Sequence, residues 1–270
     1  MPLRDDIPTT LNGGSMTAQA IDLKGLDKLK VPGDVRKDLE KFIYEILEHY
    51  KQNLISVTAF GSVVSGDFVS ETSDVNLLVI YSDLDIEQLS PVAELAQRWL
   101  KKRKFSPRFL SKRNLVDSNR YFQIDQMEMR DSHVVLYGEN ILKTLPIHPE
   151  DMRWQLAYEI KSMRMRIKQQ FWRACGNERM MRLILLKRFS SLMHLTRALF
   201  FLIKKPTPFS HKEIASLAVQ ELKIDSKFVD KMFDLKTSKE EMPTNKLVQL
   251  FDELMEMIRQ VDDRVEQIKG

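Results

Sequence analysis

The second half of the chain is almost free of glycine, and this constrains the fold more than any other feature. After Pro149 only Gly176 and Gly270 interrupt the sequence, and apolar residues recur at steps of three and four positions. Such steps place apolar side chains on one face of a helix. We expect helices over residues 152–174, 179–203, 212–222 and 244–268. Helices of these lengths are typical of an antiparallel bundle.

The first half has a different pattern, in which short apolar runs alternate with helical periods. Strands are predicted over residues 55–60, 75–81, 121–129 and 134–137, which are short segments rich in apolar or β-branched residues. We expect one helix after Pro32 and Gly33 and another over residues 91–104, where Ser90 is a suitable cap. The fold class is therefore α+β. It comprises a mobile tail over residues 1–22, a small mixed-sheet domain with helices over residues 23–145, and an all-α helical bundle over residues 146–270.

The composition argues against a membrane-spanning or disulfide-rich protein. No stretch of 18 uncharged apolar residues occurs, because the nearest candidate, 192–203, contains His194 and Arg197. Cys175 is the single cysteine, so an internal disulfide cannot form. The N-terminus lacks the basic start and apolar run of a signal peptide. We expect a cytoplasmic protein that does not bind membranes.

Basic residues are concentrated between residues 150 and 205, where 13 Lys and Arg stand against 4 Asp and Glu. Such an excess favours a phosphate-bearing partner, either a nucleotide or a nucleic acid. A solvated helix face explains the same excess equally well. Lys161, Arg164 and Lys168 share one face by helical spacing. If the bundle packs over a nucleotide site, we expect Lys161 and Arg164 to contact the nucleotide.

One segment of the first half carries residues suited to chemistry. A strand ends just before Gly61 and Ser62, which form a turn whose backbone N–H groups and hydroxyl suit an anion. The next strand opens with Asp74, and Asn76 faces the same side because side chains alternate along a strand. A carboxylate and an amide beside an anion-binding turn suit Mg²⁺ bound to a triphosphate.

This pattern resembles the nucleotidyltransferase superfamily with the DNA polymerase β-like catalytic core, in particular small prokaryotic members with a C-terminal helical bundle. The matching residues are Gly61, Ser62, Gly66, Ser73 and Asp74, together with the later segment 122–138. The resemblance implies transfer of a nucleoside monophosphate from an NTP such as ATP to a hydroxyl acceptor, with Mg²⁺ or Mn²⁺ as cofactor. It also implies that Gly61, Ser62 and Ser73 bind the nucleotide.

The resemblance further implies a set of metal ligands, namely Asp74, Asn76 and Asp125, of which Asp74 and Asp125 are the catalytic carboxylates. Members of the superfamily carry a third carboxylate on a later strand. Asp125 matches it best, and Glu128 is the second choice because a small misalignment would exchange the two.

Asn76 departs from the pattern, because members of the superfamily have a second Asp there. Three carboxylates hold two cations in the superfamily mechanism, one activating the acceptor hydroxyl and one steadying the departing pyrophosphate. An amide is a weaker ligand than a carboxylate, and the lost charge amounts to roughly 1–4 kcal/mol at close range. We expect lower metal affinity and weakened activity, unless Asp67, Glu71 or Asp125 compensates.

Other functions stay open. The main alternative is a catalytically degenerate module that binds a nucleotide as a sensor, or that binds a partner in the manner of an antitoxin. An RNA-binding adaptor that uses the basic helix is a third reading. Arg188 and His194 also have the Arg-x₄₋₆-His spacing of HEPN-type nucleases, which arises easily by chance. The sequence identifies neither the base nor the acceptor, whether small molecule, protein or RNA, and leaves a homodimer open.

Overall fold

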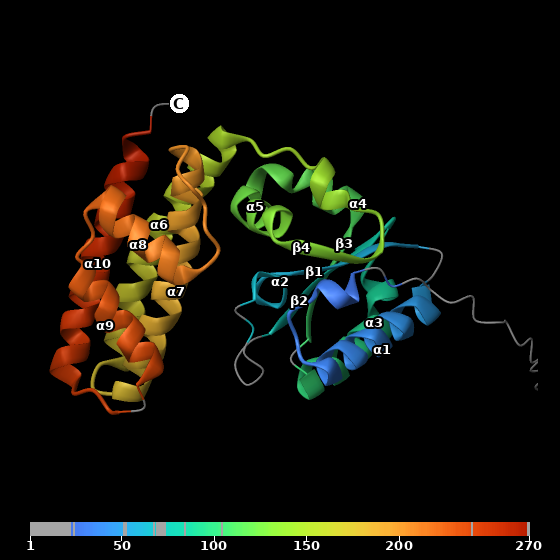
Figure 1. Ribbon diagram of the computed structural model, residues 1–270, viewed down its shortest axis with the longest axis horizontal. Helices are drawn as coiled ribbons and strands as arrows, with labels where there is room; N and C mark the ends of the chain where they lie inside the picture. Colours follow the sequence, from blue (N-terminus) through green and yellow to red (C-terminus); the bar gives the residue numbers. More distant parts are fainter. Residues whose placement is uncertain are drawn as a thin grey trace, which may run out of the picture.

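The computed structural model describes residues 23, 25–50, 53–66, 68, 74–83, 85–103, 105–238 and 240–268. The expected tail over residues 1–22 lies outside them. A sheet domain and a helical bundle lie beside each other, joined by a segment that leads into the first bundle helix (Figure 1). The expected fold class, a small mixed sheet with helices followed by helices alone, is confirmed.

The sheet domain contains four strands with helices between them. Its elements are α1 (Gly33–Tyr50), β1 (Leu54–Phe60), α2 (Ser62–Ser65), β2 (Val75–Tyr81), α3 (Ile86–Arg103), β3 (Phe105–Ser111), α4 (Lys112–Asp117), α5 (Gln123–Asp131) and β4 (His133–Gly138). Three short 3₁₀ helices complete it: η1 (Leu26–Lys28), η2 (Asn119–Tyr121) and η3 (Ile141–Thr144). The strand order is β3-β2-β1-β4, with β1 antiparallel to both neighbours and β3 parallel to β2.

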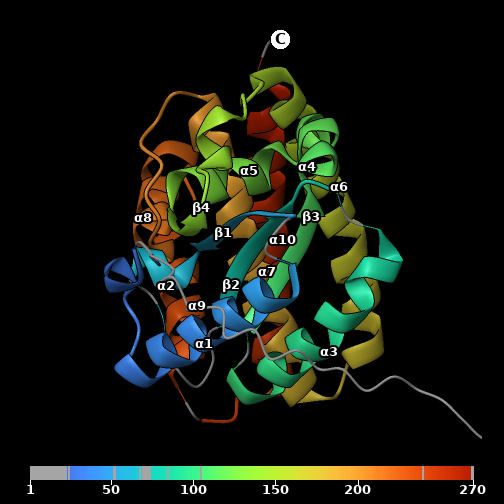
Figure 2. The same ribbon diagram turned by 90° about the vertical axis from the view of Figure 1, so that its right-hand side faces the viewer.

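The sheet has helices on both faces, as Figure 2 shows from the side of this domain. Residues such as Leu77 and Val79 pack against α1 and α3. Phe60 and Leu78 face the other way, in a smaller cluster that includes Met129 of α5. Since side chains alternate along a strand, the second face is also the face of Asn76, because Phe60 pairs with Asn76 across β1 and β2.

The bundle contains α6 (Pro149–Ala174), α7 (Glu178–Leu202), α8 (His211–Leu222), α9 (Ser226–Thr237) and α10 (Thr244–Glu266). Four of these lie where the apolar periodicity predicts helices. The sequence analysis did not include α9, which Asp225 caps by accepting a hydrogen bond from the backbone N–H of Lys227. Within the described residues, no helix combines the length and hydropathy that crossing a membrane requires.

Two expectations for the sheet domain are wrong, and one strand was not expected. Residues 121–129 form no strand: η2 ends there and α5 begins. A helix suits this segment because Ile124 and Met127 pack into the bundle core while Met129 packs under the sheet. The missing strand is β3, whose Pro107 is tolerated because β3 is an edge strand. Finally, α3 begins at Ile86, so Ser90 lies inside the helix and caps nothing.

Candidate functional site

The turn after β1 has the conformation that the sequence predicts. Gly61 has φ +78° and ψ −145°, a backbone conformation that residues with a side chain rarely adopt. It opens α2, and a Cβ at this position would lie 3.3 Å from the Nδ2 of Asn76. The structure therefore brings Gly61, Ser62 and Asn76 together at one end of the sheet. Asp74 directly precedes β2 at the same end and is exposed.

Lys30 is a cation at this turn that the sequence analysis did not identify. Its backbone N–H donates to the carbonyl of Val63 over 2.8 Å, and its Nζ donates to the carbonyl of Ser65 over 3.1 Å. These bonds tie the chain before α1 to α2 and place an ammonium group beside Gly66. No local motif marks Lys30, because its partners lie 35 residues downstream.

The strand beside β2 carries no carboxylate. Within β3, Ser106 pairs with Asn76 and Arg108 pairs with Leu78, so both share the face of Asn76. The guanidinium of Arg108 lies 5.5 Å from the ring of Phe60, and its Nη1 donates to Oδ1 of Asp125 over 3.4 Å. The sequence analysis expected Asp125 on a strand, but it lies on α5, where Arg108 pairs with it.

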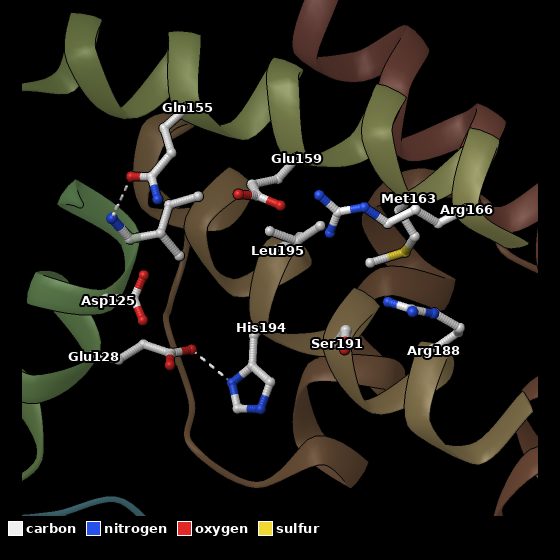
Figure 3. Close-up of a pocket in the computed structure, with 11 residues that line it drawn as sticks. Asp125, Glu128, Gln155, Glu159, Met163, Arg166, Arg188, Ser191, His194 and Leu195 are labelled. Atoms are coloured by element: carbon white, nitrogen blue, oxygen red, sulfur yellow. Dashed lines mark hydrogen bonds and ion pairs between the residues drawn. The ribbon is translucent and has the colours of Figure 1, made fainter. Parts of the chain in front are cut away.

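A pocket of about 340 Å³ lies between α5 and the first two bundle helices. Its lining residues are Ile124, Asp125, Glu128, Gln155, Glu159, Met163, Arg166, Arg188, Ser191, His194 and Leu195. Asp125 and Glu128 enter it from α5 on one side, and Arg166 and Arg188 point into it from the other side (Figure 3). The pocket thus has an acidic end next to the sheet domain and a basic end within the bundle.

His194 and Glu128 form an ion pair at the acidic end. The Nδ1 of His194 donates to Oε1 of Glu128 over 2.6 Å. Burial lowers the pKa of His194, but the hydrogen bond and charge of Glu128, with a smaller contribution from Asp125, outweigh it, so the pKa lies above its ordinary value. The two candidates for the third carboxylate therefore both line the pocket, each with a different cationic partner.

Two guanidinium groups form the basic end. The Nε of Arg188 donates to Oε1 of Gln170 over 2.8 Å. Burial and the nearby charge of Arg166 lower the pKa of Arg188, which indicates two like charges held close together. Such a pair favours an anion, because guanidinium groups bind phosphate oxygens in a bidentate manner.

Lys161 and Arg164 are not part of this pocket. Lys161 forms ion pairs with Asp262 over 3.0 Å and Glu266 over 2.8 Å, and Arg164 pairs with Asp262 over 2.9 Å. These contacts hold α6 against α10. Helical periodicity puts Arg166 on a different face of α6, so the cations that line the pocket come from the face that the sequence analysis passed over.

Arg197 is a charge that the bundle encloses, as its apolar surroundings in the sequence suggest. Its side chain is 2% exposed, its Nη2 pairs with Asp131 over 2.8 Å, and its guanidinium lies 4.3 Å from the ring of Phe209. Its Nε donates to the carbonyls of Thr207 and Pro208. Arg197 thereby fastens α7 to the C-terminal end of α5, the helix that carries Asp125 and Glu128.

The residues present fit one divalent cation better than two. No group of three or more His, Cys, Asp or Glu side chains is placed to hold a metal ion within the described ranges. Asp74 and Asn76 offer one carboxylate and one amide oxygen, a sufficient set for Mg²⁺ that keeps its waters and binds phosphate oxygens. The positive charge of Arg108 beside Asp125 opposes a second cation. Ser73, Asp67 and Glu71 lie outside the described residues.

Comparisons with known proteins find a similar structure but no similar sequence. No protein-family model matches the chain, and no curated protein matches it. A solved structure of the spectinomycin adenyltransferase AAD(9) from Enterococcus faecialis, with ATP and spectinomycin, has the same fold with a TM-score of 0.55. The match covers 86% of this chain and 99% of that chain at 14% identity. The expected likeness in fold to nucleotidyltransferases is therefore confirmed.

Proposed function

We propose that this chain binds a nucleoside triphosphate with Mg²⁺ and transfers its nucleoside monophosphate to a hydroxyl acceptor, with weaker activity than a complete carboxylate triad supports. The observation that carries the proposal is the close approach of Asn76 to the Gly61 turn, within a fold shared with an adenyltransferase. That adenyltransferase was solved with ATP and spectinomycin.

A continuous set of contacts links the turn to the pocket. Gly61 follows Phe60, whose ring lies beside Arg108, and Arg108 pairs with Asp125, which lines the pocket. In the proposed complex the triphosphate lies between these two places. Gly61, Ser62 and Lys30 bind it on the sheet side, and Arg166 and Arg188 bind it from the bundle.

Asp74 and Asn76 hold the metal ion in this proposal. When bound, Mg²⁺ neutralises charge on the phosphate oxygens of the NTP. The chain's own part is to position the triphosphate. Arg108 stands on β3 and shares the face of Asn76, so its guanidinium takes over part of the charge neutralisation that a second metal ion would supply.

The acceptor hydroxyl occupies the acidic end of the pocket. Its oxygen attacks the α-phosphorus, a new P–O bond forms, the bond to the bridging α–β oxygen breaks, and pyrophosphate leaves. The hydroxyl proton passes to the carboxylate of Glu128, which His194 orients through their 2.6 Å hydrogen bond. The carboxylates of Asp125 and Glu159 accept hydrogen bonds from further hydroxyl or ammonium groups of the acceptor and so fix its orientation.

A nucleotide sensor without turnover is the second candidate. The amide of Asn76 and the cationic Arg108 at the sheet end favour it, because both lower the affinity of this site for metal ions. Such a protein binds the NTP between the same residues and does not release pyrophosphate.

Pyrophosphate release in the presence of each of the four NTPs, with a panel of hydroxyl acceptors, separates the two candidates. Transfer of an α-labelled phosphate to an acceptor, lost in Asp74→Ala and increased in Asn76→Asp, supports the enzyme. Binding of an NTP without any release, in wild type and in Asn76→Asp alike, supports the sensor. Unchanged transfer by Asp74→Ala would show that the assignment of this site is wrong.

A further inference from the structure

The outer face of α6 carries an unusual stripe of large exposed apolar side chains. Trp154, Tyr158, Met165 and Trp172 are 67%, 64%, 62% and 78% exposed. Helical spacing places them on one face, which is distinct from the core face and from the pocket face. Scattered exposed apolar residues are ordinary, but four on one face form a patch of the kind that marks an interaction site.

We propose that this stripe is a self-association surface, on which a second copy of this chain docks with its α6 antiparallel to the first. The stripe is defined as Trp154, Tyr158, Lys161, Met165, Lys168 and Trp172. Its steps are four, three, four, three and four residues, so the spacing, but not the residue order, is the same in both directions. A two-fold dimer requires such a self-complementary surface, because every contact between a residue of one copy and a residue of the other occurs a second time with the copies exchanged.

The antiparallel register follows from this symmetry, with the two-fold axis level with position 163. Trp154 then lies opposite Trp172 of the second copy, so that aromatic rings meet at both ends. Tyr158 lies opposite Lys168, a cation over an aromatic ring. The alternating steps of three and four are those of packed helix pairs.

The exposed apolar side chains supply more than half of the area that a stable interface buries. Large aromatic side chains bury about 150–250 Å² each, so the four apolar residues of the stripe offer roughly 500 Å² per copy. A stable interface needs about 800 Å² per partner, and the flanking charged side chains can supply the difference. A second copy explains the stripe better than a single-stranded nucleic acid, because Asp262 and Glu266 of α10 neutralise Lys161 beside it.

Sedimentation of the full chain over about 1–100 µM tests the proposal. We expect a dimer in wild type, and a dissociation constant raised at least tenfold in Trp154→Ala/Trp172→Ala. Ile86→Ala is the matched control, because Ile86 is 86% exposed on α3, outside the bundle. Both replaced side chains are exposed, so we expect the double variant to fold, and circular dichroism checks this. A monomeric wild type over the whole range, or a dimer that the double variant leaves unchanged, would overturn the proposal.

Disulfide cross-linking tests the register. Tyr158→Cys and Lys168→Cys are each made with Cys175→Ser. A mixture of the two proteins should form a mixed disulfide, whereas each alone should not, since its own cysteines would lie about 15 Å apart along the helix axes. Cross-linking of each variant with itself, or of neither alone nor mixed, would refute the antiparallel register. Tryptophan-dependent binding of a single-stranded oligonucleotide by a monomer would identify another occupant and overturn the dimer.

Discussion

The sheet end around Gly61 and the pocket between α5, α6 and α7 differ in how they are built. The sheet end depends on backbone geometry: a glycine with positive φ, a short helix and an amide packed against the turn. The pocket depends on ionisable side chains from three helices distant in sequence. The sheet end has the amide of Asn76 and the guanidinium of Arg108, whereas several carboxylates and guanidinium groups line the pocket. In the proposed complex the bundle therefore contributes much of the phosphate binding.

The largest effect is expected for the ion pair that holds α5, which carries the acidic residues of the pocket, against α7. Asp131→Ala leaves the buried charge of Arg197 unpaired, which should lower the free energy of unfolding by roughly 3 kcal/mol, because an uncompensated buried charge is costly. Chemical denaturation measures it. Asp117→Ala, which removes an exposed pair with Arg113, should cost less than about 0.5 kcal/mol. Equal losses in the two variants would contradict the role given to Arg197.

Introducing a second carboxylate at the sheet end tests the other of the two regions. Asn76→Asp should increase the Mg²⁺-dependent affinity for NTP about tenfold or more, because a second anionic ligand strengthens cation binding by roughly 1–4 kcal/mol. Calorimetric titration measures this. Asn53→Asp makes the same charge change at the opposite end of β1 and should leave the affinity unchanged. A gain in both variants would mean that net charge, not the site, is responsible.

Variants on two faces of α6 test the contribution of the bundle to NTP binding. Arg166→Gln should weaken NTP binding about tenfold, since a charge-assisted hydrogen bond contributes about 1.5–3 kcal/mol. Arg164→Gln is the matched control two positions away: it loses the pair with Asp262 and should keep the affinity. If Arg164→Gln weakens binding and Arg166→Gln does not, the nucleotide lies on the face expected from the sequence.

The smallest effect concerns His194. Its folded-state pKa lies above the ordinary value, so the stability that its pair with Glu128 contributes is complete below the ordinary histidine pKa of about 6.5. It is lost as the pH rises through the folded-state pKa. The difference in melting temperature between wild type and His194→Gln should therefore shrink from pH 6 to pH 9. A difference that grows with pH would show that His194 is not held in its charged form.

The features that could be predicted from the sequence are those that depend on local spacing. Four bundle helices follow from apolar periodicity, and the closeness of Gly61 and Asn76 follows from a turn between two short strands. In these cases the residues that determine the structure are neighbours in the chain, and burial requires the same conformation that the local pattern favours.

The remainder depends on contacts between distant segments. The α5 segment has apolar residues at mixed steps because it packs against both the sheet and the bundle, so neither period dominates. The edge position of β3 explains its proline and arginine, and an edge is a property of the whole sheet. The pairing of Lys161 with Asp262 spans 101 residues, which no local pattern reveals.

Calorimetric titration of the wild-type chain with each NTP, with and without Mg²⁺, tests the central claim most directly. The account predicts binding of at least one NTP that requires Mg²⁺ and disappears in a folded Asp74→Ala variant. Absence of binding of all four NTPs by the folded protein, or equal binding by Asp74→Ala, would contradict it.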